Sequence, residues 1–358
     1  MITARDRDAR GIVLAMLCGL SLVPGCATSP TPTDAPRPVV ISTDGSRMRV
    51  TVIGPLPTRP HAPTARGRLA NFLYGPETET ASRFRRPQGL AVGQGALFAC
   101  DQGLSDVLRY DPIEQTLLSW IRLTDRPTCP VAVASDTSGV YVVDAAERTV
   151  LMYDPRGRRV RRITPPSIED YKPTAVAVHD GVLFITDSVH HVVHRVRLDT
   201  LEWLPSWGAE KGADPLALPS GLTVTARGEL LVSDAMLGLV HRFDQDGKRL
   251  RPLGEYGGEE GQLVRPMGVV EALPGVILIA DAGRESLVGF DSDGKPLFET
   301  GGHRGDWGGM LMPSGLASFD MEREPASGEP PQPSTSATIA VSDTLSAQIL
   351  LLELEMSP

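Results

Sequence analysis

The chain has 358 residues, a formal net charge of −9, 41% hydrophobic residues and 22% charged residues. This composition excludes a disordered chain, a coiled coil and a polytopic membrane protein, and the acidic balance disfavours a nucleic-acid partner. The 36 glycines and 31 prolines, with only 5% aromatic residues, predict many turns and many short strands.

The first 25 residues have the pattern of an export signal. Residues 12–23 form an apolar run that is too short to span a bilayer but matches the apolar region of a signal peptide. The next residues, Val-Pro-Gly-Cys at 23–26, resemble the bacterial lipobox, in which the cysteine is lipidated. The resemblance implies that residues 1–25 are a lipoprotein signal peptide and that Cys26 carries a covalent lipid. An uncleaved anchor and an ordinary secretory signal remain as alternatives.

Residues 26–67 predict a tether between the lipid and a folded domain. The segment is rich in proline and threonine, so it favours an extended spacer, and a hairpin could form over residues 38–53 around Asp44 and Gly45. Ala27, directly after the cysteine, resembles the pattern that sorts Gram-negative lipoproteins to the outer membrane. The predicted location is therefore the bacterial cell envelope, lipid-anchored at the outer membrane.

A motif repeats six times along the rest of the chain. Each unit begins with a proline followed by a short apolar run, and these prolines lie 43 to 47 residues apart. The leading prolines are Pro87, Pro130, Pro173, Pro219, Pro266 and Pro313. A second apolar run in each unit ends in an aspartate, namely Asp101, Asp144, Asp187, Asp234, Asp281 and Asp343.

The runs within a unit fit the strands of a propeller blade. The first run contains small residues, which suit an inner strand near a crowded axis, and the second is continuously apolar, which suits a strand covered on both faces. The terminal aspartate suits a turn, so a structural role is predicted for all six. Six four-stranded units predict an all-β fold, a six-bladed β-propeller over residues 68–355.

The closure of the ring can also be predicted from spacing. The sixth unit ends after its third run, whereas residues 68–75 lie before Pro87 at the distance that separates a fourth strand from the next leading proline. We therefore expect this N-terminal strand to complete the last blade. A proline-rich insertion, residues 322–336, falls between the first and second strands of unit six.

These units resemble the NHL repeat. The pattern Pro-x-Gly-Leu-x-Val, the run that ends in aspartate and the Asp-Gly-Lys turn are similar to that family's repeat, and the resemblance covers about residues 68–355. It implies a propeller fold but not one function, because NHL propellers include RNA-binding domains, sensors, lyases and scaffolds.

Histidines of units three and four provide candidates for a metal site. Peptidyl-hydroxyglycine lyases, which share this propeller, bind zinc through histidines from several blades, so His190, His191 and His241 are the candidate ligands here. However, His194 and His241 occupy equivalent repeat positions where the other units have Leu or Val. Packing and loop roles are therefore favoured, and no metal or other cofactor is predicted beyond the lipid.

Two further observations bear on catalysis and covalent structure. Metal-dependent propeller hydrolases resembling gluconolactonases gather carboxylates at the channel mouth, but no carboxylate directly follows a leading proline in this chain. The residues at that position are Gln88, Val131, Thr174, Ser220, Met267 and Ser314. Cys100 and Cys129 are expected near one face of adjacent blades, which is compatible with a disulfide and equally with two free thiols.

The sequence favours a non-enzymatic function. The predicted protein is a membrane-anchored, exported propeller that acts as a binding or scaffold module in a cell-envelope assembly, with an envelope protein or peptide as its partner. A propeller lyase or hydrolase with a His-based metal site is the alternative, and recognition of a glycan or small ligand in the channel also remains open.

Overall fold

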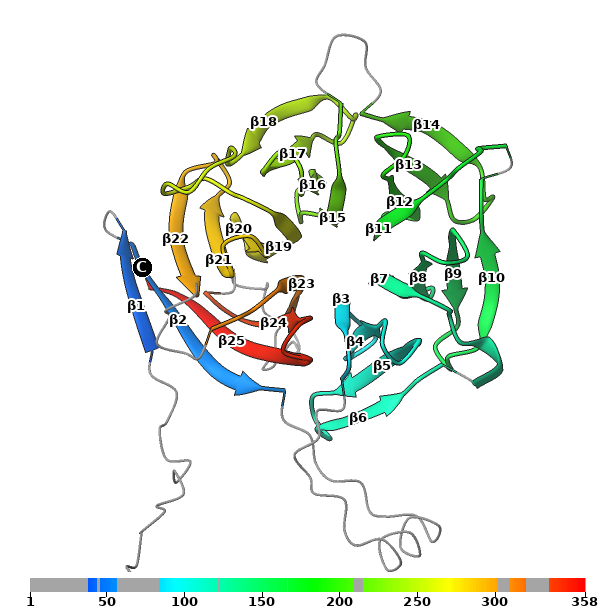
Figure 1. The fold of residues 1–358 in the computed structure, drawn as a ribbon, viewed down its shortest axis with the longest axis horizontal. Helices are drawn as coiled ribbons and strands as arrows, with labels where there is room; N and C mark the ends of the chain where they lie inside the picture. The colour runs from blue at the N-terminus through cyan, green and yellow to red at the C-terminus, as the bar shows by residue number, and fades with distance from the viewer. Residues whose placement is uncertain are drawn as a thin grey trace, which may run out of the picture. The chain divides into compact units, whose positions relative to one another are not determined.

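The strands form six antiparallel sheets around a central axis, and each sheet is one blade of a six-bladed β-propeller (Figure 1). The structure, a computed structural model, describes residues 38–43, 46–56, 84–121, 123–165, 167–208, 215–301, 309–319 and 335–357. These residues belong to one compact unit, Pro36–Pro358. The only helical element in this described part is a 3₁₀ turn, η1 (Leu123–Asp125). The predicted all-β propeller is confirmed.

Five blades are built from four consecutive strands each. Blade one contains β3 (Pro87–Gly93), β4 (Ala96–Asp101), β5 (Asp106–Asp111) and β6 (Thr116–Ser119). Blade two contains β7 (Pro130–Ser135), β8 (Val140–Asp144), β9 (Thr149–Tyr153) and β10 (Arg159–Ile163). Blade three contains β11 (Pro173–His179), β12 (Val182–Asp187), β13 (Val192–Arg197) and β14 (Trp203–Trp207). Blade four contains β15 (Pro219–Val224), β16 (Leu230–Asp234), β17 (Leu239–Phe243) and β18 (Arg249–Leu253). Blade five contains β19 (Pro266–Leu273), β20 (Val276–Asp281), β21 (Ser286–Asp291) and β22 (Pro296–Gly301).

The sixth blade combines the two ends of the chain. Its first three strands are β23 (Pro313–Phe319), β24 (Ser336–Asp343) and β25 (Gln348–Ser357). The N-terminal strand β2 (Ser46–Pro55) pairs antiparallel with β25, and β1 (Pro38–Thr43) pairs with the outer edge of β2. Figure 1 shows these two blue strands beside the red C-terminal strand. An N-terminal strand therefore completes the last blade, as predicted, and this sheet has five strands.

The residues that close the ring differ from those predicted. Residues 68–75 lie outside the described residues, and the position beside β25 is occupied by β2, which belongs to the predicted tether, residues 26–67. The physical reason is the two-sided pattern of β2. Met48 and Val50 are buried against blade five, whereas Arg49 is exposed and its Nη1 lies 3.2 Å from a carboxylate oxygen of Glu355. A spacing argument does not detect such pairing between distant segments.

The repeated motif predicts the strand boundaries of the other elements. Each leading proline begins the first strand of its blade, and each repeated aspartate ends the second strand. The second strands are buried along their length, apart from the first residues of β12 and β24, as expected for a strand covered by two neighbouring blades. Residues 320–334, which include most of the predicted insertion 322–336, lie outside the described residues.

The hydrophobic core is distributed between the blades. Among the described residues, the buried apolar side chains form six clusters, and each cluster joins two neighbouring blades. The cluster between blades one and two, for example, contains Phe98 and Val107 from one side and Val142 and Tyr153 from the other. Since every blade depends on both neighbours for burial, closure of the ring completes the core.

Candidate functional site

One end of the propeller axis is the candidate site, because all six blades present turns there. In every blade the leading proline pairs with the aspartate that ends the second strand, so first strands start and second strands end at this side. We call this surface the mouth face. Its described turns, which follow the second strands, are residues 102–105, 145–148, 188–191, 235–238, 282–285 and 344–347. Its described segments before the leading prolines are residues 84–86, 123–129, 167–172, 215–218, 254–265 and 309–312.

An axial cavity opens among the first strands. Its volume is about 290 Å³, and residues of all six blades line it. The six residues that directly follow the leading prolines all contribute, together with glycine, alanine and branched apolar side chains such as Leu90 and Val176. The described lining contains no aspartate or glutamate.

The hydroxyl groups of the lining contact the protein itself. Thr174 donates to the backbone oxygen of Pro219 at 2.7 Å, and Ser220 donates to that of Pro266 at 2.8 Å. Ser314 lies 2.9 Å from the hydroxyl of Thr344. The first two contacts join the inner strands of neighbouring blades. These hydroxyls thus tie the ring together, and the lining is less polar than its composition suggests.

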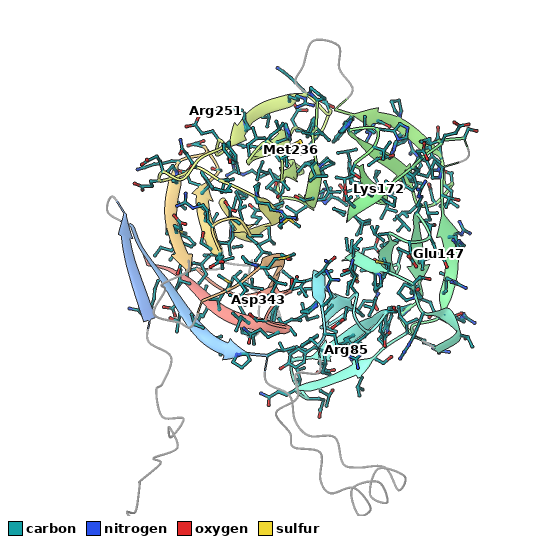
Figure 2. The ribbon with its side chains drawn as sticks, viewed as in Figure 1. Arg85, Glu147, Lys172, Met236, Arg251 and Asp343 are labelled. Carbon is teal, nitrogen blue, oxygen red and sulfur yellow. The ribbon has the colours of Figure 1, made fainter. Side chains whose placement is uncertain are left out.

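Two cations lie at the entrance of the cavity, and neither was predicted from the sequence. Lys172 and Arg265 line the cavity, are exposed, and directly precede the leading prolines of blades three and five. Figure 2 shows Lys172 beside the inner strand of its blade and Arg251 at the rim of the ring. The missed signal was the residue before each proline, which alternates around the ring between cationic and uncharged types. The six are Arg86, Cys129, Lys172, Leu218, Arg265 and Met312.

The six repeated aspartates are structural clamps. Each is fully buried, at 0% exposure, and its carboxylate accepts hydrogen bonds from backbone N–H groups of two segments. Asp281 is representative: it accepts from Val264 and Arg265, which precede the leading proline of its own blade, and from Gly283 and Arg284, in its own turn. The remaining five are Asp101, Asp144, Asp187, Asp234 and Asp343, with the same pattern of partners. These carboxylates are occupied by the fold rather than free for a ligand.

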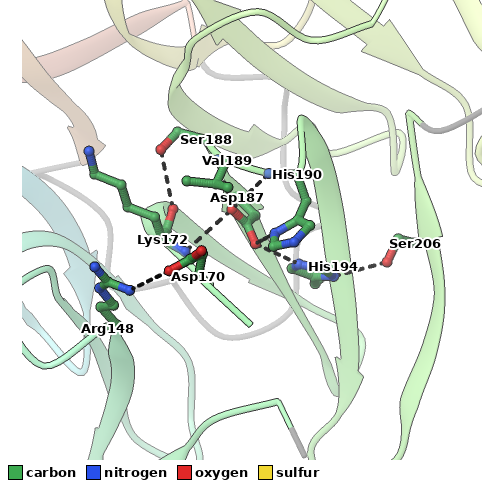
Figure 3. A network of polar contacts seen from close by, with 9 residues as sticks. All are labelled: Arg148, Asp170, Lys172, Asp187, Ser188, Val189, His190, His194 and Ser206. Carbon is green, nitrogen blue, oxygen red and sulfur yellow. Dashed lines mark hydrogen bonds and ion pairs between the residues drawn. The ribbon is translucent and has the colours of Figure 1, made fainter. Parts of the chain in front are cut away.

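Histidines of blade three contact one of these clamps (Figure 3). His190 donates through Nδ1 to Oδ2 of Asp187 at 2.8 Å, and His194 donates through Nε2 to the same oxygen at 3.2 Å. Burial raises the pKa of the Asp187 carboxyl, but the hydrogen bonds from His194, the backbone and His190 outweigh burial and hold the pKa well below its ordinary value. His191, the other candidate of this turn, is exposed and has a positive φ of 59°.

His241 belongs to a separate site in blade four. Its Nε2 donates to Oδ2 of Asp234 at 3.3 Å, while Nη1 of Arg249 donates to its Nδ1 at 3.2 Å. Both ring nitrogens therefore contact protein groups. Across the described ranges, no three His, Cys, Asp or Glu side chains converge in a way that could hold a metal ion. The structure thus does not bring His190, His191 and His241 together.

The two cysteines of the propeller are free thiols. Cys100 is buried among the apolar side chains between blades one and two. Cys129 is half-buried, and its Sγ lies 3.4 Å from Nε2 of Gln102. The disulfide that the sequence allowed is not formed. Burial, with a smaller contribution from Asp101, raises the pKa of the Cys100 thiol well above its usual value, which keeps it protonated and weakly reactive.

The predicted lipid attachment site is not among the described residues. Cys26 and the signal sequence 1–25 are outside the described residues. Within the part of the chain that the structure describes, we find no helix with the length and apolar character needed to cross a bilayer.

Comparisons with known proteins support the fold. No protein-family model matches the chain, and no curated protein matches it significantly. A streptogramin B lyase structure is 11% identical with a TM-score of 0.54, over 77% of this chain and 95% of that one. Virginiamycin B lyase from Staphylococcus aureus is 12% identical with a TM-score of 0.53, over 89% of this chain and 96% of that one.

A third similar structure has no assigned activity. It is a protein of unknown function from Bacteroides thetaiotaomicron, 16% identical with a TM-score of 0.57, over 78% of this chain and 71% of that one. At such identities the similarity concerns architecture and not chemistry. The chain is therefore a six-bladed β-propeller whose structural neighbours include propellers of the virginiamycin B lyase type.

Proposed function

We propose that this chain is an exported lipoprotein whose NHL-type propeller binds an envelope protein or peptide without catalysing a reaction. The supporting observation is where exposed apolar side chains lie. Among the described residues, ten large apolar side chains are exposed, and six belong to the mouth face. These six are Val189, Leu218, Met236, Tyr256, Leu311 and Leu345. Exposed apolar side chains gathered on one face are typical of an interaction surface.

The proposed anchor is a lipid on Cys26. It is supported by the lipobox-like residues 23–26 and by the apolar run before them. A diacylated cysteine would hold the propeller stably at the outer membrane of the bacterial envelope, because several acyl chains bury enough apolar surface for lasting attachment. The net charge of −9 supports a protein partner over nucleic acid.

The alternative, a propeller lyase or hydrolase with a His-based metal site, has weaker support. His190 and His194 both donate to Asp187, and His241 contacts Asp234 and Arg249. Side chains used in this way orient a turn rather than present a shared set of ligands.

Site-specific photo-crosslinking in cells tests the proposal. A photoreactive amino acid at Met236 or Leu345 samples the mouth face, and the same residue at Ile113, which is 83% exposed in the turn after β5, samples the opposite face. We expect both mouth positions to capture the same envelope protein, and Ile113 to capture none. A second substitution, Leu218→Glu, should abolish that crosslink because it adds a charge to the apolar surface.

Three outcomes would contradict parts of the proposal. Equal crosslinking from Ile113, or none from either mouth position, would contradict the proposal that the mouth face binds a protein. If the Cys26→Ser chain remains in the membrane fraction, the proposed lipid anchor is contradicted. If the protein binds one equivalent of zinc and loses it when His190 and His191 are replaced by alanine, the enzymatic alternative is favoured over the binding module.

A further inference from the structure

We propose that the axial cavity binds a carboxylate carried by a small apolar body, with the carboxylate between Lys172 and Arg265 and the apolar body inside the ring. The cavity opens on the mouth face and shares Leu218 with the protein-binding surface proposed above, but this inference does not depend on that surface. Three features of the cavity support this ligand: the charges at its entrance, the absence of compensating carboxylates in the described lining, and the apolar character of the interior.

The two cations project from fixed positions. The backbone N–H of Arg265 donates to Oδ1 of Asp281 at 2.8 Å, and that of Lys172 donates to Oδ1 of Asp187 at 3.3 Å. The clamps therefore hold the backbone from which each side chain extends toward the axis. Figure 3 shows the Lys172 side chain directed away from the Asp187 network. Such preorganisation lowers the ordering cost of binding an anion.

The positive charge at the entrance is uncompensated within the described residues. Neither Lys172 nor Arg265 has an ion pair there, whereas other arginines of the molecule do, such as Arg284 with Glu299. The nearest carboxylates of the repeat, Asp187 and Asp281, are buried and accept backbone N–H groups. An anion at the entrance thus meets two cations that have no ion pair in the described part of the chain, and arginine can bind a carboxylate through two parallel hydrogen bonds.

The interior selects an apolar body. Beyond the entrance the wall consists of glycine, alanine and branched side chains, including Ala132, Val176 and Leu222, and its hydroxyls donate to backbone carbonyls. A volume of about 290 Å³ lies at the lower end of the range for small-ligand pockets. The cavity therefore suits a short apolar chain or one apolar side chain.

Two sources present this chemistry. A fatty-acid-like small molecule carries a carboxylate on an aliphatic chain, and an apolar peptide carries one at its C-terminus. The shared recognition element is the same, so the experiment compares both sources directly. Exposed Val189, Leu218 and Met236 near the entrance give a peptide additional surface that a small acid would leave uncovered.

Calorimetric titration of the purified chain carrying Cys26→Ser tests the proposal. The probes are octanoate, its neutral analogue octanol and its cationic analogue octylamine. We expect saturable 1:1 binding of octanoate that weakens with added salt, and affinity for octanol and octylamine lower by about tenfold or more. Lys172→Gln and Arg265→Gln should each weaken octanoate binding about threefold to tenfold, since each removes one charge-assisted contact.

Matched controls separate this site from general surface charge and from misfolding. Arg161→Gln removes an exposed arginine on the outer strand β10 and should leave octanoate binding unchanged. Ala235→Phe places a ring at the entrance from a turn and should abolish binding without shifting the unfolding midpoint. A leucine-rich tripeptide with a free carboxyl terminus, compared with its amide, distinguishes the two sources. If the free tripeptide binds more tightly than octanoate, the natural ligand is a peptide C-terminus. If it binds more weakly, the natural ligand is a small acid.

The proposal is overturned by any of three results. These are the absence of saturable octanoate binding, equal affinity for octanol, and octanoate affinity unaffected by both Lys172→Gln and Arg265→Gln. None of these results alters crosslinking from Met236 or Leu345, so failure here is distinguishable from failure of the proposed protein-binding function.

Discussion

At the scale of single residues, the aspartates that end the second strands explain much of the mouth face. Each buried carboxylate collects backbone N–H donors from its own turn and from the segment before the leading proline. A buried carboxylate is tolerated only when its hydrogen-bonding capacity is satisfied, and here the backbone satisfies it. Because these negative charges are occupied internally, exposed cations such as Lys172 dominate the entrance of the cavity.

Asp234 tests this role through its pH dependence. Burial raises the pKa of the Asp234 carboxyl, but hydrogen bonds from His241 and backbone N–H groups outweigh it and hold the pKa well below its ordinary value. The folded state therefore favours the ionised form. The resulting stability is present above the unfolded pKa, about 4, and is lost as the pH falls toward the folded pKa.

We expect Asp234→Asn to lower the free energy of unfolding by about 2–4 kcal/mol at pH 7, because the amide cannot accept all of these donors. Urea unfolding between pH 7 and pH 2.5 should show this difference narrowing below about pH 4. Asp246→Asn, at an exposed turn position, is the control and should have little effect at any pH. A difference that stays constant with pH would contradict the assignment.

At the scale of elements, the first strands are shaped by their neighbours in the adjacent blades. A Cβ at Gly221 would overlap the backbone oxygen of Met267, and one at Gly315 would overlap that of Gln88. The glycines are thus required by the close approach of two inner strands and not by backbone conformation. This contact explains why the first run of each unit is rich in small residues.

Gly221→Ala should separate β15 from β19 and lower the free energy of unfolding by about 1–3 kcal/mol or more, since neither backbone can yield without disturbing the ring. Gly258→Ala is the matched control, because a Cβ there meets no atom within 4 Å. Thermal unfolding of both variants measures the effect. Equal midpoints for the two variants would show that the inner strands have more room than the structure gives them.

At the scale of the whole molecule, ring closure depends on one pair of strands from opposite ends of the chain. β2 pairs with β25 from Arg47 opposite Ser357 to Pro55 opposite Leu350, and it contributes Met48 and Val50 to the core between blades five and six. Without this pairing, the edge of β25 and that apolar cluster would be exposed.

Val50→Asp should therefore lower the free energy of unfolding by about 3 kcal/mol or more, because it buries an unpaired carboxylate at the closure. Arg49→Ala, on the exposed side of the same strand, removes only a surface ion pair and should cost less than about 1 kcal/mol. Guanidinium unfolding measures both. Unchanged stability for Val50→Asp together with a loss for Phe72→Asp would instead favour closure by residues 68–75.

For the candidate site, the sequence predicted the position of residues but not their contacts. The residues after the leading prolines line the cavity as their register implied, and the repeated aspartates lie at the turns. The contacts of His194 and His241 with the repeated aspartates were not predictable. Each histidine lies seven residues after its aspartate, and the pairing of the second and third strands brings the two side chains together. Within the described residues Lys172 has no ion pair, and this likewise depends on which carboxylates the fold has already occupied.

The sequence by itself determined the number of blades, their strand boundaries and the turn aspartates, since these follow from a local pattern repeated six times. Only the tertiary structure decided which N-terminal strand closes the ring, and which charges remain free at the entrance. Closure is a choice between segments about 300 residues from their partner, made by the fit of Met48 and Val50 to a neighbouring blade. Local periodicity does not predict such a fit, because the fit depends on side chains that meet only after the ring has formed.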